Sequence, residues 1–361
     1  MRVGVVGLSH FHVTGWVETI EAFPAELEIV ALYDPDPERG RALAPPHHDP
    51  TLRPSLGERY RGLPFETRLH DLIERHAIDV ALVTLPNAEG PEAIAILAGA
   101  GVHMLIDKPA ARSAAELRPA ADRVSTAGVR VVVGLTRRFA PAAIAAREVV
   151  RSGRVGRLLS AEAVFATSSV AIRDPRNILF DRAASGGGIL SWLGVHDIDA
   201  LRWLSGEEIV AVSAMSGTGH NGLEVEDVIS VGMRFAGGAI GTIHGSYSLP
   251  APGYRGRLAL RGVEGSIELA ADDELVVLTQ GPDGSLHEDR ASFSRPPVAG
   301  YGAQGRAAVE DPLGRIADGG ETAAPLDELV RDLAVIDAAY SSAATGRTVA
   351  VDDHIEERST K

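Results

Sequence analysis

The chain has 361 residues, 45% of them hydrophobic and 23% charged, a composition typical of a globular protein rather than a disordered or fibrous one. Lys and Arg total 35 against 49 Asp and Glu, and the formal charge of -14 has the wrong sign for a broad nucleic-acid-binding surface. Cysteine is absent, which excludes disulfides and thiol nucleophiles. With no membrane-length apolar run and no signal-peptide pattern, we expect a cytoplasmic protein with neither a nucleic-acid nor a membrane partner.

Short β-branched runs alternate with helical stretches over the first third of the chain. Strands are predicted at 2–6, 28–33, 79–85, 102–106 and 129–134, and helices at 13–22, 68–76, 89–100 and 113–127. This alternation is typical of βαβ units, which right-handed crossovers build into a doubly wound parallel sheet. The proline-rich stretch 44–62 breaks the pattern and is predicted to be a surface loop. We therefore predict an α/β domain over residues 1–134.

The pattern changes after residue 134. Predicted elements are a helix at 141–152, a strand at 158–167, an irregular stretch at 173–185, a helix at 189–204, and strands at 209–216, 228–235, 239–248, 256–261, 266–269 and 274–279. Hairpin-linked strands after a helix predict an α+β domain with a large, mostly antiparallel open sheet. We expect this domain to span 135–345, with its last helix, 327–345, packing back near the first domain. Residues 346–361 are predicted to form a short strand and a tail.

The turn from Gly7 to His12 joins the first strand to the first helix, where dinucleotide-binding folds carry the pattern G-x-G-x-x-G. Only its first glycine is present, as Gly7, because Ser9 and His12 occupy the places of the other two. The string alone is therefore a weak indication, and a plain turn with two surface histidines is the alternative interpretation. In a nucleotide site, His10 and His12 could donate to phosphate oxygens.

Polar residues also follow the other predicted strands of this domain. Asp34 ends the second strand, where an acidic side chain would accept from the adenosine ribose and repel a 2′-phosphate, which favours NAD over NADP as cofactor. The alternative is that Asp34 only caps a helix that starts at Pro37. Open α/β sheets bind ligands outside the carboxyl ends of their strands, where the later predicted strands place Thr84, Pro86, Asn87, Asp107 and Lys108.

Several strings resemble the glucose-fructose oxidoreductase and inositol dehydrogenase family (Gfo/Idh/MocA). Asp107-Lys108-Pro109 is similar to the family's Glu-Lys-Pro signature, and the other similar strings lie at 134–141, 152–156, 186–199 and 262–266. Their order and spacing extend the resemblance from residue 1 to about 352. The resemblance implies an NAD(P)-binding Rossmann domain, a second domain for substrate binding and oligomerisation, and assembly as a homodimer or homotetramer. It also implies hydride transfer between NAD, or NADP, and a hydroxyl or keto carbon of a sugar, cyclitol or related polyol, with the nicotinamide between the domains.

The resemblance also implies two catalytic residues. Lys108 would bind the reacting hydroxyl or carbonyl, and a lysine desolvated beside a cofactor has a lowered pKa that suits proton transfer. His196 would exchange a proton with the same oxygen. The alternatives are a solvated loop lysine and a histidine satisfied by a backbone carbonyl.

The sequence departs from the family at two places in these motifs. Trp192 stands four residues before His196, where the family typically has an aspartate. Asp199 lies three residues after His196 and could share its helix face, so it is the preferred substitute over Asp197 and the third candidate catalytic residue. Gly90-Pro91 stands near a position at which the family often has a histidine.

Arginines supply the remaining candidates. Arg137 is assigned to the cofactor, while Arg138, Arg173 and Arg176, together with Trp192, are assigned to the substrate, because guanidinium groups grip carboxylates and phosphates. For Arg137 and Arg138, an ion pair at the domain interface is the alternative. No His or Asp string shows a metal-site spacing of the H-E-x-x-H or paired Cys/His kind, so we predict no metal.

The departures leave two alternatives to a dehydrogenase. One is a lyase or glycosidase that retains NAD and uses a transient oxidation, and the other is a non-catalytic ligand-binding or regulatory protein. Replacing Lys108 by Ala separates the classes, because either enzyme would lose turnover whereas a sensor would lose only affinity.

Overall fold

The computed structural model describes residues 1–10, 12–38, 60, 62–168, 170, 173, 177–218, 222–249, 253–270, 273–293 and 300–351. The chain forms two compact units. Unit 1 comprises Met1–Thr136, Ile172–Gly186 and Pro296–Val330, and unit 2 comprises Arg137–Ala171, Gly187–Arg295 and Arg331–Lys361. The predicted boundary at residue 134 lies beside the first passage between the units, but no pattern in the sequence had indicated the two later segments of unit 1.

Unit 1 is built on a parallel sheet whose described residues form six strands in the order β3-β2-β1-β4-β5-β6. The strands are β1 (Arg2–Val6), β2 (Glu28–Tyr33), β3 (Phe65–Glu66), β4 (Val80–Val83), β5 (His103–Ile106) and β6 (Val131–Val133). This order is that of a doubly wound dinucleotide-binding fold. Central strands are apolar on both faces because helices cover both sides of such a sheet, as the fully buried Val3, Val5 and Val6 illustrate.

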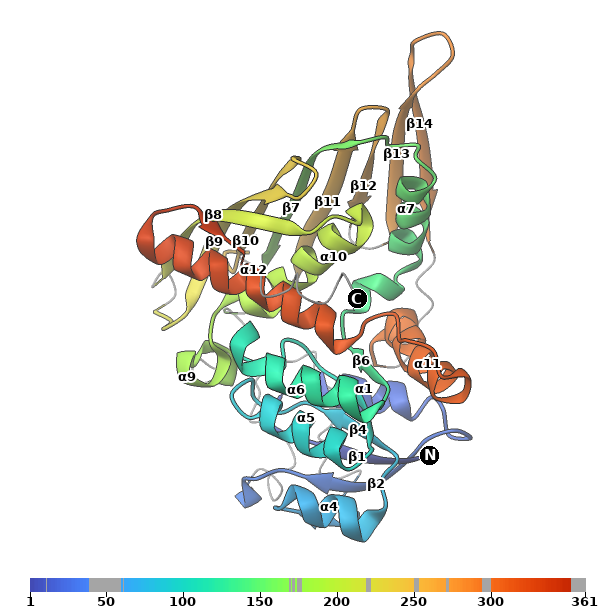
Figure 1. Cartoon of the computed structure of the whole chain (residues 1–361), viewed down its shortest axis with the longest axis vertical. Helices are drawn as coiled ribbons and strands as arrows, with labels where there is room; N and C mark the ends of the chain where they lie inside the picture. Colours follow the sequence, from blue (N-terminus) through green and yellow to red (C-terminus); the bar gives the residue numbers. More distant parts are fainter. Residues whose placement is uncertain are drawn as a thin grey trace. The chain divides into compact units, whose positions relative to one another are not determined.

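The helices of unit 1 are α1 (His12–Ile20), α4 (Leu69–His76), α5 (Gly90–Gly99), α6 (Ala114–Ala127), α9 (Arg182–Ser185) and α11 (Gly302–Asp318). Helices α5 and α6 pack side by side, and α11 packs against α1 and β6 (Figure 1). The segment after α11 continues along the sheet, because the Val133 N–H donates to the Ala324 carbonyl at 2.8 Å. The last segment of unit 1 thus covers and extends its first.

Unit 2 contains an open sheet whose described residues form nine strands in the order β14-β13-β12-β11-β7-β10-β9-β8-β15 (Figure 1). The strands are β7 (Leu158–Thr167), β8 (Ile209–Thr218), β9 (Glu226–Phe235), β10 (Ile240–Ser246), β11 (Tyr254–Gly262), β12 (Gly265–Ala270), β13 (Glu274–Gln280), β14 (Leu286–Ser292) and β15 (Val349–Ala350). Every recorded pairing is antiparallel except that of β7 with β10. Side chains alternate along β9, where Ile229, Val231 and Met233 are buried and Arg234 is exposed. One face of the sheet is therefore covered and the other is open.

Helical segments accompany this sheet: α7 (Pro141–Arg151), the π-helical η3 (Leu190–Gly194) and α10 (Val195–Ser205). The 3₁₀ segment η1 (Thr136–Phe139) spans the first passage between the units, and η2 (Ile178–Phe180) lies in unit 1. Helix α12 (Leu326–Thr345) belongs to unit 1 up to Val330 and to unit 2 from Arg331.

The predicted fold class is confirmed: a doubly wound parallel sheet is followed by a large, mostly antiparallel one. The elements that were not predicted are α11, β14, the π-helical form of η3 and the short β3, η1, η2 and α9. The proline-rich loop predicted at 44–62 lies largely outside the described residues. Among the described helices, none is both long enough and apolar enough to cross a membrane.

Candidate functional site

The turn after β1 is fixed to both neighbouring strands. Gly7 has φ +98°, and a Cβ there would lie 2.6 Å from the Leu85 backbone nitrogen, so only glycine fits. The Gly7 N–H donates to the Tyr33 carbonyl at 2.8 Å, and the Thr84 hydroxyl donates to the Gly7 carbonyl at 2.6 Å. The first glycine and the strand-end threonine predicted from the sequence therefore build one turn.

Asp34 binds the same turn from the end of β2. Its Oδ2 accepts from the Leu8 N–H at 2.8 Å and its Oδ1 accepts from the Asp36 N–H at 3.0 Å, and the residue is completely buried. The Glu38 N–H is bound by Asp36 rather than by Asp34. Asp34 thus holds the backbone of the turn.

The Asp107 carboxylate contacts ring nitrogens of residues in the turn and in α1. Its Oδ2 lies 2.8 Å from Nδ1 of His12 and 3.3 Å from Nδ1 of His10, while its Oδ1 accepts from Nε1 of Trp16 at 2.9 Å. Lys108, the next residue, is 3% exposed. The carboxyl end of β5 is therefore tied to the start of α1, as the sequence-based strand-end hypothesis requires.

Burial and charge determine how these groups titrate. Burial lowers the pKa of both His10 and His12, and Lys108 and Arg173 add to that lowering, so both imidazoles are neutral at pH 7. Burial alone would raise the pKa of Asp107, but His12, His10 and Lys108 outweigh it and hold that pKa well below its ordinary value. The site thus combines an ionised carboxylate with neutral imidazoles.

The later segments of unit 1 complete this edge. The Tyr301 ring lies 4.4 Å from the Trp16 ring and 5.5 Å from that of His12, between ring centroids. Burial raises the pKa of Tyr301 well above its ordinary value, and Asp107 raises it further. Tyr301 had not been predicted, because its place beside residues nearly 300 positions earlier has no local sequence signal. Arg176 lies outside the described residues.

The strand-end residues after β4 contact another returning segment. The Asn87 side chain donates to the Ser185 carbonyl at 2.8 Å, and the Ala88 N–H donates to the Ala184 carbonyl at 3.2 Å. A Cβ on Gly90 would lie 2.0 Å from the Ala110 carbonyl oxygen. Gly90 therefore permits close packing of α5 against the loop after Lys108.

In unit 2, His196 and Trp192 belong to one continuous helical stretch with a π-helical start. Trp192 lies within η3 and is 3% exposed, while His196 lies in the first turn of α10 and is half-buried. π-Helical turns are rare and occur frequently at functional sites. The large indole is accommodated in the core of unit 2, where the family typically has a carboxylate.

The two aspartates after His196 are both held by arginines. Arg137 binds Asp197, and its other terminal nitrogen donates to the Tyr254 hydroxyl at 2.5 Å. Arg138 Nε donates to both oxygens of Asp199, at 2.9 and 3.1 Å, in a buried pair. The candidate catalytic helper Asp199 and the candidate substrate residue Arg138 are thus partners of each other.

Glu226 anchors the glycine run before η3. Its oxygens accept from the Gly188 N–H at 2.7 Å, the Leu190 N–H at 3.0 Å and the Tyr340 hydroxyl at 2.7 Å. Burial raises the pKa of Glu226 despite these donors. Glu226 was not predicted as a site residue, because the residues that it joins lie 36 or more positions away in the sequence.

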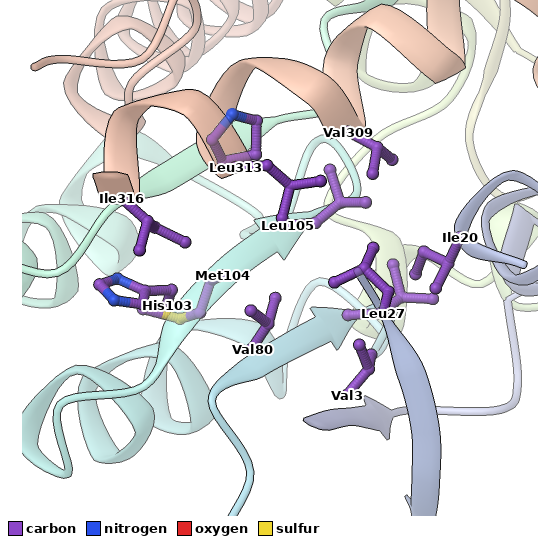
Figure 2. A pocket seen from close by; sticks show the side chains of 12 residues that line it. Val3, Ile20, Leu27, Val80, His103, Met104, Leu105, Val309, Leu313 and Ile316 are labelled. Carbon is purple, nitrogen blue, oxygen red and sulfur yellow. The ribbon is translucent and has the colours of Figure 1, made fainter. Parts of the chain in front are cut away.

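A small apolar cavity lies at the opposite edge of the unit 1 sheet (Figure 2). Val309, Leu313 and Ile316 of α11 line one side of it. The other side includes Val80 and His103, which are the first residues of β4 and β5. The cavity lies between α11 and the sheet, and none of the site residues described above lines it.

Comparison with known proteins identifies both halves of the chain. Residues 1–135 match a family model described as an oxidoreductase family with an NAD-binding Rossmann fold, and residues 143–268 match the Gfo/Idh/MocA C-terminal domain. The chain is 29% identical to inositol 2-dehydrogenase of Rhizobium meliloti over 298 residues, which covers 79% of this chain and 85% of the relative. It is 25% identical to levoglucosan dehydrogenase of Pseudarthrobacter phenanthrenivorans over 307 residues, or 74% and 78% of the two chains.

Solved structures agree on the fold. A levoglucosan dehydrogenase in complex with NADH and levoglucosan superposes with a TM-score of 0.82 at 23% identity and covers 98% of this chain and 99% of its own. The family resemblance and the NAD-binding fold expected from the sequence are confirmed by these matches. The chain belongs to the Gfo/Idh/MocA family of oxidoreductases.

Proposed function

We propose that the protein is an NAD-dependent dehydrogenase that transfers a hydride between the nicotinamide and a hydroxyl or keto carbon of a sugar, cyclitol or related polyol. Relatives named inositol 2-dehydrogenase and levoglucosan dehydrogenase support this substrate class. The observation that carries the proposal lies directly after β5. Asp107 is hydrogen-bonded to His12 at the end of the turn after β1, and the next residue, Lys108, is buried.

The residues present fit the cofactor. Ser9 Oγ is buried and has no hydrogen-bond partner within the described part of the chain, so it is available for a phosphate oxygen. Asp34 stands where the ribose hydroxyls are bound in such folds, and its charge disfavours a 2′-phosphate, so NADP should bind more weakly than NAD. The remaining parts of the cofactor would be held by the turn from Gly7 to His12 and by the strand-end residues Thr84, Pro86 and Asn87.

Bound NAD would supply the hydride acceptor or donor, while the protein positions the substrate and moves its proton. Lys108 would donate a hydrogen bond to the reacting oxygen, and His196 would exchange a proton with it. The sequence contains only two lysines, Lys108 and Lys361, in a chain that otherwise uses arginine for positive charge. An ammonium that can deprotonate suits proton transfer, whereas a guanidinium does not. A lysine at position 108 is therefore consistent with a chemical requirement at that site.

The remaining candidates have supporting roles in the proposal. Asp199 and Arg138 would brace the helix that carries His196, since each satisfies the charge of the other. Arg137 and Asp197 would do the same from η1. Arg173 and Trp192 are candidate contacts to the substrate. Because Trp192 stands where the family typically has an aspartate, we expect the substrate to differ from that of relatives with the aspartate.

The test is reduction of NAD⁺, followed at 340 nm, with a panel of cyclitols and anhydrosugars that includes myo-inositol and levoglucosan. Wild type should turn over at least one of them, and Lys108→Met should lower kcat by about 10²- to 10⁴-fold with NAD⁺ binding retained. Lys108→Arg should not rescue turnover. Full activity in Lys108→Met would refute the assignment.

The products of the reaction separate the alternative functions. A lyase or glycosidase that retains NAD would release no NADH but would incorporate solvent deuterium into its product. A non-catalytic binding protein would do neither and would show only ligand affinity. Trp192, which replaces the usual aspartate, is the observation that keeps these two candidates under test.

We further propose that copies of the chain associate through the open face of the unit 2 sheet. Met215 is 77% exposed, and Ile240 and Val164 also project apolar side chains into solvent. Light scattering should report a dimer or tetramer for wild type and a smaller species for Met215→Asp. We also propose a cytoplasmic location, with which the cysteine-free sequence is consistent.

A further inference from the structure

We propose that His10, His12 and Asp107 form a binding site for one divalent transition-metal ion such as Zn²⁺ or Co²⁺. No metal was predicted from the sequence, because no His or Asp string shows the H-E-x-x-H or paired Cys/His spacing of a metal site. The fold supplies the third ligand 95 residues after His12, at the carboxyl end of β5. Two imidazoles and a carboxylate form a recurrent metal-binding set with positions left open for other ligands.

The geometry of the three groups suits a single ion. One ligand atom from each residue lies within 4.8 Å of the other two. The Asp107 Oδ2 is 2.8 Å from Nδ1 of His12 and 3.3 Å from Nδ1 of His10. Ligand atoms bound to one zinc ion at about 2.1 Å lie roughly 3 to 3.5 Å apart, so these two spacings need little change.

The hydrogen bonds indicate which nitrogens can bind. His10 Nδ1 accepts from the His12 N–H at 3.2 Å, so in the neutral ring its lone pair is on Nδ1 and its proton on Nε2. Binding of the ion by this lone pair would replace the hydrogen bond from the His12 N–H. His12 Nδ1 donates to Asp107 and would bind the ion once its proton moves to Nε2. That shift releases no net proton, and the ion takes the place of the shared proton between His12 and Asp107.

Surrounding side chains hold the three ligands in place. The Trp16 indole donates to the second oxygen of Asp107 at 2.9 Å, which leaves the other oxygen as a single ligand atom. The rings of His10 and His12 meet edge to face at 4.4 Å between centroids, and Tyr301 packs on His12. Such contacts orient metal ligands, and their loss typically weakens binding about 10- to 100-fold.

Local charge selects the kind of ion. Lys108 and Arg173 place positive charge near both histidines, which opposes any dication. Ions that bind only through charge, such as Mg²⁺ and Ca²⁺, prefer oxygen ligands and gain little from imidazole. Zinc and cobalt bind imidazole nitrogen strongly, so they are the ions expected here.

The experiment uses the full-length protein after treatment with a chelator and dialysis. Co²⁺ is titrated and followed by its visible absorption, and Zn²⁺ is titrated by calorimetry, in wild type and in His10→Asn, His12→Asn and Asp107→Asn. The matched control is His76→Asn, because His76 also lies 2.8 Å from a carboxylate, through Nε2 to a Glu66 oxygen, and is not part of the three-ligand cluster.

Wild type and His76→Asn should each bind one ion per chain, and each ligand variant should bind at least about tenfold more weakly. Absence of binding by wild type, or equal binding by the ligand variants, would overturn the proposal and leave a hydrogen-bonded His-Asp cluster. The histidine variants decide the matter if Asp107→Asn does not fold, as judged by circular dichroism. NAD⁺ binding to the metal-free protein is measured in parallel, because its loss would count against the proposed function and not against the metal site.

Discussion

Ser9 shows how a single residue can change a nucleotide-binding turn. A glycine at this place leaves room for the cofactor's backbone contacts, whereas serine adds a side chain with a buried hydroxyl. A buried hydroxyl without a partner costs folding free energy, so its retention is explained if a ligand satisfies it.

We therefore expect Ser9→Ala to weaken NAD⁺ binding about 10- to 100-fold, because a hydrogen bond to a charged group contributes about 1.5 to 3 kcal/mol. Intrinsic fluorescence or calorimetric titration measures the dissociation constant. Ser125→Ala, on the exposed side of α6, is the control and should bind as wild type does. Tighter binding by Ser9→Ala would show that the hydroxyl obstructs the cofactor.

The pair Arg138 and Asp199 illustrates why a residue's role was harder to predict than its position. Helix spacing correctly placed Asp199 on the helix with His196, but no local pattern could show that an arginine 61 positions earlier reaches it. The same limit applies to Tyr301 and Glu226, whose partners are distant in sequence. By contrast Gly7, Asp34 and Lys108 follow strands, and strand ends of a parallel sheet gather at one edge.

Removal of one partner from this buried pair should be costly. Arg138→Met should lower the free energy of unfolding by about 3 to 5 kcal/mol, because it removes the arginine that neutralises a buried carboxylate. The double variant Arg138→Met/Asp199→Leu should recover much of that loss. Denaturant unfolding measures both, with Arg154→Met as control, since Arg154 and Asp289 form an exposed pair that contributes little to stability. Equal losses in the free energy of unfolding for Arg138→Met and Arg154→Met would contradict this expectation.

At the scale of elements, those with regular apolar periodicity were predicted and the irregular ones were not. Helix α11 contains Pro312 and, after its first residue, the glycines Gly305 and Gly314, and all three residues lower helix propensity. Its formation therefore depends on packing against α1 and β6. Strand β14 is exposed along its whole length and therefore lacks the alternation that identifies a half-buried strand. The π-helical turn of η3 depends on tertiary contacts, among them Glu226.

Glu226 binds the amino end of this element, so its protonation should affect stability. Burial raises the pKa of Glu226, and the folded state then holds a proton more tightly than the unfolded state. The contribution of this group to the free energy of unfolding is accordingly present below its unfolded pKa, about 4.3, and falls as pH rises through the higher folded pKa.

Glu226→Gln removes this titration. The stability of wild type relative to Glu226→Gln should therefore decrease as pH rises through that window and become constant above it. Chemical unfolding at a series of pH values measures the difference, and the exposed Glu264→Gln serves as control. A difference that grows with pH would mean that the carboxylate is stabilised in the folded state, contrary to the effect of its burial.

At the scale of the whole molecule, the dinucleotide-binding unit is assembled from three separate segments. Residues 1–134 contain every strand of its sheet, and on sequence grounds they were predicted to be a domain. Yet the edge strand β6 is bonded at Val133 to Ala324, Trp16 is covered by Tyr301, and the loop after β4 is bonded to the segment that carries Ser185. A fragment that ends at residue 134 lacks all three partners.

We expect this fragment to fold without a cooperative thermal transition and to bind a hydrophobic dye, because α11 no longer covers the apolar side chains of α1 and the sheet. Addition of a synthetic peptide of residues 296–330 should reduce dye binding and restore part of the transition, since it returns Tyr301 and α11. A peptide of the same composition in scrambled order is the control. If the fragment alone melts as sharply as the full chain, the later segments merely decorate a self-sufficient domain, and the assembly of unit 1 from distant parts of the chain has no energetic importance.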